Sequence, residues 1–114
     1  MVHVALEAAE LLSKEGIELE VVDLRTVSPL DREAIAETVR RTSKVIILHE
    51  HVRTGGIAGE ISAIINEEAF DSLDGPIIRL TGLDSPVPFS PPQEEFFLPK
   101  LNDVVREARK LAAY

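Results

Sequence analysis

The sequence predicts an α/β fold, with helices covering both faces of a mainly parallel sheet. Helical and strand patterns alternate along the 114 residues, which favours right-handed βαβ units. One run near the middle is apolar at every position, as in a buried parallel strand. With 45% apolar and 28% charged residues, the composition is that of an ordinary globular protein. Together these observations indicate three layers, α/β/α.

The chain is expected to begin with a helix followed by a strand. Residues 2–15 place apolar side chains at helical spacing, and Gly16 follows them as a candidate C-cap. The apolar, β-branched run at 19–24 then predicts a short strand. Because the chain opens on a helix, the strand that would feed that helix is missing from the pattern.

A second helix is expected after the turn-forming residues 28–31. Ser28 is the predicted N-cap, and Pro29 stands in the first turn, where its missing N–H costs nothing. The helix should run to about Thr42, with Ile35 and Val39 facing the core.

The clearest strand pattern is the run Val45–Leu48, which ends at His49. It is apolar on both faces, as in a central strand of a parallel sheet. The loop 50–55 then leads to a helix over 56–69, which carries isoleucines on one face.

A third strand is predicted over 76–80, closing at Gly82. The stretch 86–92 contains four prolines and is expected to be an extended surface segment. The last helix, over 100–112, has the most regular apolar period. Its basic residues lie near the carboxyl end, where the helix dipole favours them. Three strands are few for four helices, which suggests a fragment, a shortened gene product or a strand borrowed from a partner.

Charge and composition exclude several classes of protein. The formal net charge of −8 has the wrong sign for gripping phosphate backbones, so we expect no nucleic-acid partner. No apolar run is long enough to span a bilayer, so we expect no membrane partner. The absence of cysteine excludes disulfides, thiolate metal sites and cysteine nucleophiles. An acidic chain would more readily meet a basic partner.

The loop Arg53–Gly59 follows the central strand and opens a helix, where backbone N–H groups attract anions. Gly56 and Gly59 fit the last two glycines of a dinucleotide fingerprint, but Thr54 occupies the position of the first. We therefore favour a tight turn with close helix packing. The alternative is an independent small-molecule or phosphate-binding α/β domain that uses residues 54–59.

Two further groups of polar residues have structural interpretations. His49 and His51 would share one side of a continuing strand, but no third metal ligand follows at a useful spacing. We interpret them instead as polar residues at the end of a strand, facing a neighbouring subunit. Paired carboxylates are interpreted as solvated faces, since adjacent acids rarely occupy different environments; they are Glu67-Glu68, Asp71/Asp74 and Glu94-Glu95. No self-contained active site is predicted.

A series of motifs covers essentially the whole chain in a specific order. They are Val22-Asp23-Leu24-Arg25-Thr26-Val27-Ser28-Pro29-Leu30-Asp31, His49-Glu50, Thr54-Gly55-Gly56, Glu60-Ile61, Arg79-Leu80-Thr81-Gly82 with Asp84, Pro86, Pro88, Ser90 and Pro91, then Glu94-Glu95 and Leu98-Pro99. In this order the chain strongly resembles the C-terminal domain of the β subunit of thiamine-diphosphate-dependent 2-oxoacid dehydrogenases, of the pyruvate or branched-chain type. More distantly, it is similar to the C-terminal domain of transketolase.

The resemblance implies a single transketolase C-terminal-like domain over residues 1–114, N-terminally truncated relative to the family. In the family, an edge strand and a central strand precede the opening helix. Their absence should leave a gap between the strands expected at 19–24 and 45–48. We therefore expect an isolated monomer to be poorly stable, or to rearrange or swap elements.

The resemblance also implies a role. The whole enzyme decarboxylates a 2-oxoacid on thiamine diphosphate with magnesium and then reductively acylates a lipoyl group. Those cofactors belong to the α subunit and to the β subunit's N-terminal domain, so this chain alone is expected to bind none and to be inactive. Its expected location is the cytoplasm, or the mitochondrial matrix in a eukaryote. A degraded product without its own function is the remaining alternative.

Assembly and docking are the functions that the resemblance assigns to this domain. Assembly would join a homodimer, the α subunit or both, and its candidate interface residues are His49, Gly55, Gly56 and Ile57. Docking would hold the peripheral subunit-binding domain of a dihydrolipoyl acyltransferase. Asp74 matches the family's acidic docking position, Tyr114 lies near the terminus that joins this contact, and Asp71 is a further candidate. With Glu67 and Glu68, these acids form a negative patch that would steer a basic partner.

Overall fold

Two parallel strands form the sheet, β1 (Ile46–Val52) and β2 (Ile78–Gly82). The computed structural model describes all 114 residues. Ile46 pairs with Ile78, and the register continues to Leu48 and Leu80 before an irregularity ahead of Val52. Two of the three predicted strands, those at 45–48 and 76–80, are confirmed, but β1 has a neighbour on one side only.

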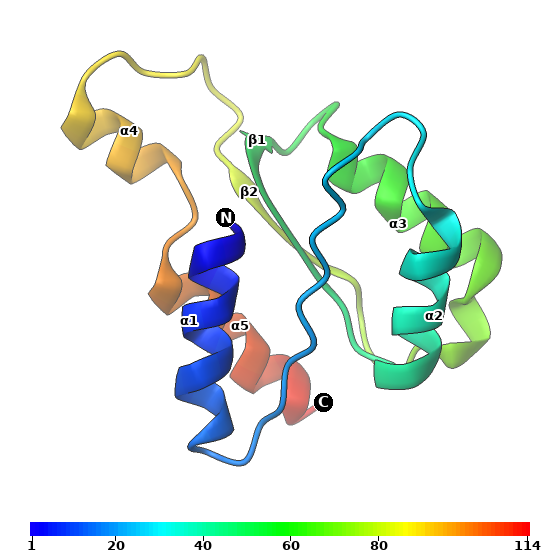
Figure 1. Cartoon of the computed structure of the whole chain (residues 1–114). Helices are drawn as coiled ribbons and strands as arrows, with labels where there is room; N and C mark the ends of the chain where they lie inside the picture. Colours follow the sequence, from blue (N-terminus) through cyan, green and yellow to red (C-terminus); the bar gives the residue numbers. More distant parts are fainter.

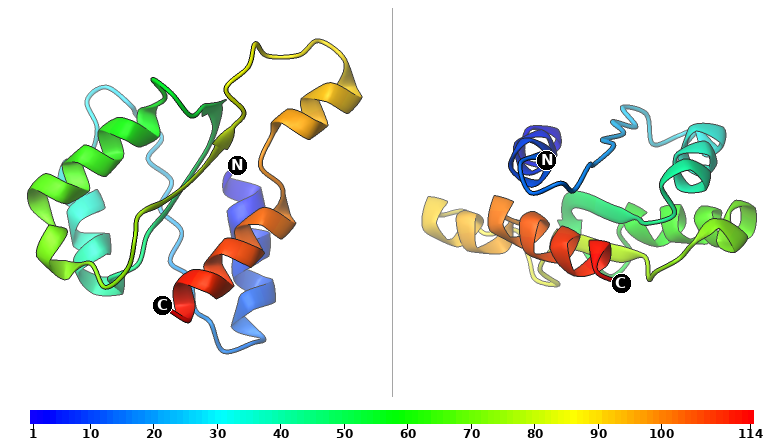
Figure 2. Two further views of the ribbon diagram at one scale, coloured as in Figure 1. Left: turned by 180° about the vertical axis from the view of Figure 1, so that it is seen from behind. Right: turned by 90° about the horizontal axis from the view of Figure 1, so that it is seen from below.

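Helices cover both faces of this small sheet, which confirms the three-layer α/β/α arrangement (Figures 1 and 2). α1 (Val2–Ser13) and α5 (Leu101–Ala112) pack together on one face. α2 (Arg32–Thr42) and α3 (Ile57–Glu68) pack together on the other. The predicted helices are therefore all present, with ends that differ by at most three residues from the expected bounds.

α1 ends as the sequence predicts. Gly16 adopts a φ of 80°, which a residue with a side chain rarely does. Its N–H donates to the Ser13 carbonyl, and the N–H of Ile17 donates to the Leu12 carbonyl. This pair of bonds is a Schellman motif, which turns the chain away from the helix.

The apolar core lies in two separate clusters, one on each face of the sheet. On one face, Ile47 of β1 packs with the buried residues of α2 and α3. On the other face, Ile46 and Leu48 pack against the buried residues of α1 and α5. This alternation follows from the pleat of a strand, which sends successive side chains to opposite faces. A small domain normally has one continuous core.

The strand predicted at 19–24 is wrong. Residues 17–24 are extended but form no strand. They run beside β1 in the same direction and are not hydrogen-bonded to it (Figure 1). Their side chains still alternate, because Leu19 packs in the α1/α5 cluster and Leu24 in the α2/α3 cluster. The segment therefore has the shape of a strand without a backbone neighbour.

The start of α2 also differs from the prediction. Ser28 is not the N-cap, since the helix begins at Arg32 and is capped by Asp31. The Asp31 carboxylate accepts a hydrogen bond of 3.0 Å from the N–H of Ala34. Asp and Ser are both good capping residues, and here the cap is the residue directly before the first helical turn.

The proline-rich stretch is extended only in its first part. Pro91 and Pro92 open a short helix, α4 (Pro91–Phe97), where the expected structure was irregular. Proline suits the first turn of a helix because the N–H it lacks would have no partner there. One further turn of 3₁₀ helix, η1 (Phe70–Ser72), follows α3.

Removing the cap of α2 tests this assignment directly. Asp31→Ala should lower the free energy of unfolding by about 1 kcal/mol, because the first turn loses its side-chain acceptor. Ser28→Ala, the matched control, should change it by less than about 0.5 kcal/mol. Urea unfolding followed by circular dichroism measures both. A larger loss in Ser28→Ala than in Asp31→Ala would contradict the structure.

Candidate functional site

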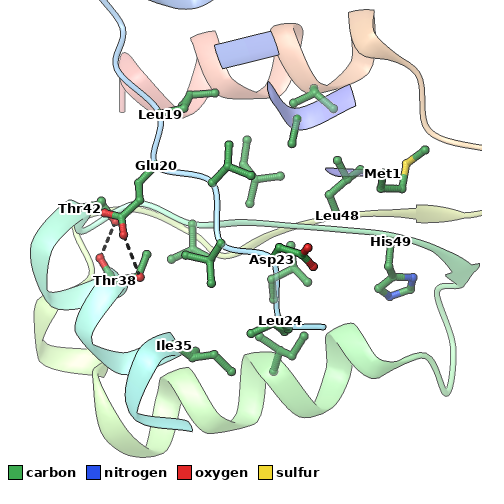
Figure 3. A pocket seen from close by; sticks show the side chains of 18 of the residues that line it. Met1, Leu19, Glu20, Asp23, Leu24, Ile35, Thr38, Thr42, Leu48 and His49 are labelled. Atoms are coloured by element: carbon green, nitrogen blue, oxygen red, sulfur yellow. Dashed lines mark hydrogen bonds between the residues drawn. The ribbon is translucent and has the colours of Figure 1, made fainter. Parts of the chain in front are cut away.

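A groove of about 600 Å³ lies between the 17–24 segment and β1 (Figure 3). Residues 17–25 form one wall and residues 44–50 the other. Apolar side chains of the four large helices line its two remaining faces. The groove occupies the place where the sequence predicted a gap, and no element fills it. The accessible surface of 7275 Å² agrees with this open shape, since scaling gives about 6,000 Å² for a compact chain of this mass.

His49 is half-buried in the middle of β1 and also lines this groove. Its Nε2 accepts a hydrogen bond of 3.3 Å from the Ala58 N–H in the first turn of α3. Its Nδ1 is buried without a partner. Burial lowers the pKa of His49, and the nearby His51 lowers this pKa further. The neutral ring is therefore an acceptor that holds the start of α3.

Hydrogen-bond donors of the loop before α3 bind an acceptor within the chain itself. The Thr54 N–H and hydroxyl donate to the two oxygens of the Asp84 carboxylate, at 2.8 and 2.7 Å. These hydrogen bonds lower the pKa of Asp84. At Gly56 a Cβ would collide with the Val52 carbonyl and lie 3.0 Å from the His49 ring. The loop is a tight turn with close packing, as favoured from the sequence, and Asp84 presents negative charge where a phosphate would have to bind.

The residues of this chain do not fit a magnesium site. No group of three or more His, Asp or Glu side chains is arranged to hold a metal ion. His49 already uses Nε2 within the fold, and His51 is exposed.

The docking residues predicted from the sequence come together at one corner of the molecule. Asp74 and Gly75 follow η1, and Gly75 lies against the end of α5. A Cβ at Gly75 would be 3.1 Å from Leu111 Cδ1 and 3.4 Å from Tyr114 Cδ1. The side chain of Asp74 is 61% exposed and Tyr114 is 77% exposed. The sequence separation between them is large, but the fold makes them neighbours.

Internal ion pairs reduce the predicted negative patch. Arg32 binds Glu67 at 2.8 Å and Glu68 at 2.6 Å, so these two carboxylates are not free charges. Asp74 pairs with Lys44, while Asp71 makes no ion pair and is exposed. We call Asp71, Asp74 and Tyr114 the acidic corner. Sequence reasoning missed its neighbour Phe70, a large apolar side chain that is 62% exposed.

The proposed subunit-interface residues lie at the opposite end of the sheet. Gly55 is exposed in the turn after β1, with a φ of 75°. His49, Gly56 and Ile57 are half-buried around the start of α3. The loop before α4 and α4 itself carry further exposed apolar side chains that the sequence did not single out; they are Val87, Phe89 and Phe96.

The pH dependence of stability tests the role of His49. Its folded-state pKa is lowered, so the unfolded chain takes up a proton more readily than the folded chain. The stabilising contribution should be complete above the ordinary pKa of about 6.5 and should decline as the pH falls below it. His49→Gln keeps an acceptor for Ala58 and cannot titrate, so stability should fall less between about pH 7.5 and 5.

Urea unfolding across that pH range measures this slope. His3→Gln, at an exposed position in α1, is the matched control and should keep the wild-type slope. An unchanged slope in His49→Gln would show that another group causes the pH dependence.

Comparisons with known proteins agree on one family. Residues 1–104 match the family described as "Transketolase, C-terminal domain". The 2-oxoisovalerate dehydrogenase β subunit of Bacillus subtilis (strain 168) is 46% identical over 114 residues, which are 99% of this chain and 35% of that protein. The mitochondrial β-2 subunit of the pyruvate dehydrogenase E1 component of Oryza sativa subsp. japonica is 42% identical over 110 residues, 96% of this chain and 29% of that protein.

A solved structure described as "Split gene transketolase, inactive beta4 tetramer" has the same fold. It matches with a TM-score of 0.80 and 30% identity, over 98% of this chain and 35% of that one. The chain thus spans about a third of the length of the curated relatives. No helix is long and apolar enough to cross a membrane. From its sequence match, its relatives and its fold, the chain belongs to the transketolase C-terminal domain family.

Proposed function

We propose that this chain is an assembly and docking domain of the decarboxylating component of a 2-oxoacid dehydrogenase. Its parent enzyme would use thiamine diphosphate and magnesium bound elsewhere, and this chain would take no catalytic part. The domain would extend over residues 1–114, since α5 continues beyond the family match at 104 and carries Ala108 and Leu111 into the core. The expected location stays the cytoplasm, or the mitochondrial matrix in a eukaryote.

The acidic corner is the observation that carries the docking role. Asp71 and Asp74 are exposed carboxylates, and Gly75, the residue after Asp74, lies close to the exposed ring of Tyr114. An aromatic anchor next to charged groups is typical of residues that dominate binding energy. The Lys44–Asp74 pair is exposed and therefore weak, so Asp74 can exchange Lys44 for a cation of a partner. A small basic domain, such as the peripheral subunit-binding domain of a dihydrolipoyl acyltransferase, fits this chemistry.

The assembly role is supported by exposed apolar surface near the carboxyl end of the sheet. α4 and the loop before it project from the body of the molecule (Figures 1 and 2). Phe96 is 76% exposed and Phe89 is fully exposed. Large apolar side chains exposed on one projecting segment favour a protein–protein contact there. A second β chain, an α subunit or both would cover it together with His49, Gly55, Gly56 and Ile57.

A calorimetric titration with an isolated peripheral subunit-binding domain tests docking. Asp74→Asn should weaken binding roughly tenfold or more, because a hydrogen bond to a charged group is worth about 1.5–3 kcal/mol. Glu7→Gln is the matched control, since Glu7 is exposed on α1 and makes no ion pair. Wild-type binding should weaken as salt is raised, because surface charges are screened.

Circular dichroism of each variant separates lost binding from lost folding. If Asp74→Asn and Glu7→Gln bound the peripheral subunit-binding domain with equal affinity, the docking assignment would be wrong. An affinity that does not change with salt concentration would show that the acidic corner is not the binding surface.

A further inference from the structure

Three aspartates of this chain precede glycine or serine, and they are Asp71, Asp74 and Asp84. At such a pair the main-chain nitrogen of the small residue can attack the carboxyl carbon of the aspartate, because no bulky side chain shields that nitrogen. The two groups belong to adjacent residues, so the reaction is intramolecular and depends on geometry. It also needs an N–H that no other acceptor holds. The fold therefore decides which of the three aspartates can react.

At two of these pairs the fold holds the N–H that would attack. The N–H of Ser72 donates to the Ala69 carbonyl at 3.1 Å, and the N–H of Ser85 donates to the Leu83 carbonyl at 2.8 Å. The carboxylate of Asp84 is also fixed, because both of its oxygens accept hydrogen bonds from the loop before α3. Attack at either pair requires that these bonds break first, which makes both aspartates slow to react.

The pair Asp74-Gly75 lacks these restraints. It lies between η1 and β2, and the N–H of Gly75 donates to no backbone carbonyl. The side chain of Asp74 is 61% exposed, and its ion pair with Lys44 lies at the surface and is therefore weak. Glycine also lets the main chain adopt conformations that other residues rarely reach. Of the three pairs, only this one combines an unshielded N–H with a carboxyl group that can turn toward it.

We propose that Asp74-Gly75 is a site of spontaneous covalent modification, at which Asp74 converts to isoaspartate in the folded chain. The nitrogen of Gly75 forms a bond to Cγ of Asp74, and the amide hydrogen leaves with a carboxyl hydroxyl as water. Water then opens the resulting cyclic imide. Opening at Cγ restores aspartate, whereas opening at the main-chain carbonyl carbon gives isoaspartate. No oxidant, reductant or cofactor takes part.

The product changes the acidic corner. In isoaspartate the main chain runs through Cβ and Cγ, so it is longer by one methylene, and the carboxylate stands directly on Cα. The N–H of Asp74 is anchored to the Ser43 carbonyl at 3.0 Å, and Gly75 packs closely against Leu111 and Tyr114. A longer chain cannot keep both contacts unchanged. Any effect on a docking partner rests on the proposed function, whereas the modification itself does not.

Incubation of the folded full chain in neutral buffer for several weeks tests the proposal. A methyltransferase specific for isoaspartyl carboxylates measures the amount of product, and peptide mass spectrometry with electron-transfer fragmentation locates it. Isoaspartate should form at Asp74 and not at Asp71 or Asp84. In urea, where the hydrogen bonds of the fold are lost, all three should react. The rate at Asp74 should differ by less than roughly tenfold between the two conditions, since exposed loops open at little cost.

Variants separate the chemistry from the surroundings. Asp74→Glu keeps the negative charge but would have to form a larger ring, so the product should disappear. Lys44→Gln releases the Asp74 carboxyl group and should speed its conversion. Lys14→Gln is the matched control, because Lys14 is exposed and distant in sequence, and it should leave the rate unchanged. Asp74→Asn would react by the same route with loss of ammonia, so the docking titration uses this variant freshly prepared.

The outcomes decide clearly once circular dichroism shows that each sample is folded. Isoaspartate confined to Asp74, and absent from Asp74→Glu, supports the proposal. A folded chain without isoaspartate at Asp74 would overturn it, whatever the urea sample contains. Equal conversion at Asp71 or Asp84 in the folded chain would also overturn it, because the free N–H of Gly75 would then not select the site. Docking is measured on fresh chain, so its failure is a separate result.

Discussion

The backbone pairing of β1 is the constraint on which the rest of the structure depends. β1 contributes Ile47 to one core cluster and Ile46 and Leu48 to the other, so it connects the two helical layers directly. Its pairing with β2 fixes only one of its edges. The open second edge explains the groove, the extra accessible surface and the division of the core into two parts.

Side chains, not backbone bonds, hold the 17–24 wall in position. Leu19 and Leu24 anchor it to the two clusters, and Glu20 reaches α2, where it binds Arg41 and Thr38. Nearby, Glu15 forms two hydrogen bonds with Arg109 of α5, which lower the pKa of Glu15. Such exposed pairs contribute little to stability because water and salt screen them. The wall is therefore held in place by a few apolar contacts and weak ion pairs, without backbone hydrogen bonds to β1.

Elements that follow from a local sequence pattern were predicted correctly. The prediction failed where contacts between residues distant in the sequence determine the structure. The apolar pattern of the sequence predicts the main helices and β1. The conformational freedom of glycine predicts that Gly16 ends α1. The 19–24 run has the side chains of a strand, but a strand also needs a neighbouring backbone, which a local pattern cannot supply. Asp74 and Tyr114 were found through a family motif, whereas the pairing of Lys44 with Asp74 and the exposure of Phe70 became visible only in the fold.

The two proposed contact surfaces lie at opposite ends of the same parallel strands. Lys44 and Asp74 precede β1 and β2, and the N–H of Asp74 donates to the Ser43 carbonyl at this end. Gly55 and Gly56 follow β1 at the other end, about 20 Å away for seven residues of strand. A partner at the acidic corner would thus leave the assembly surface free.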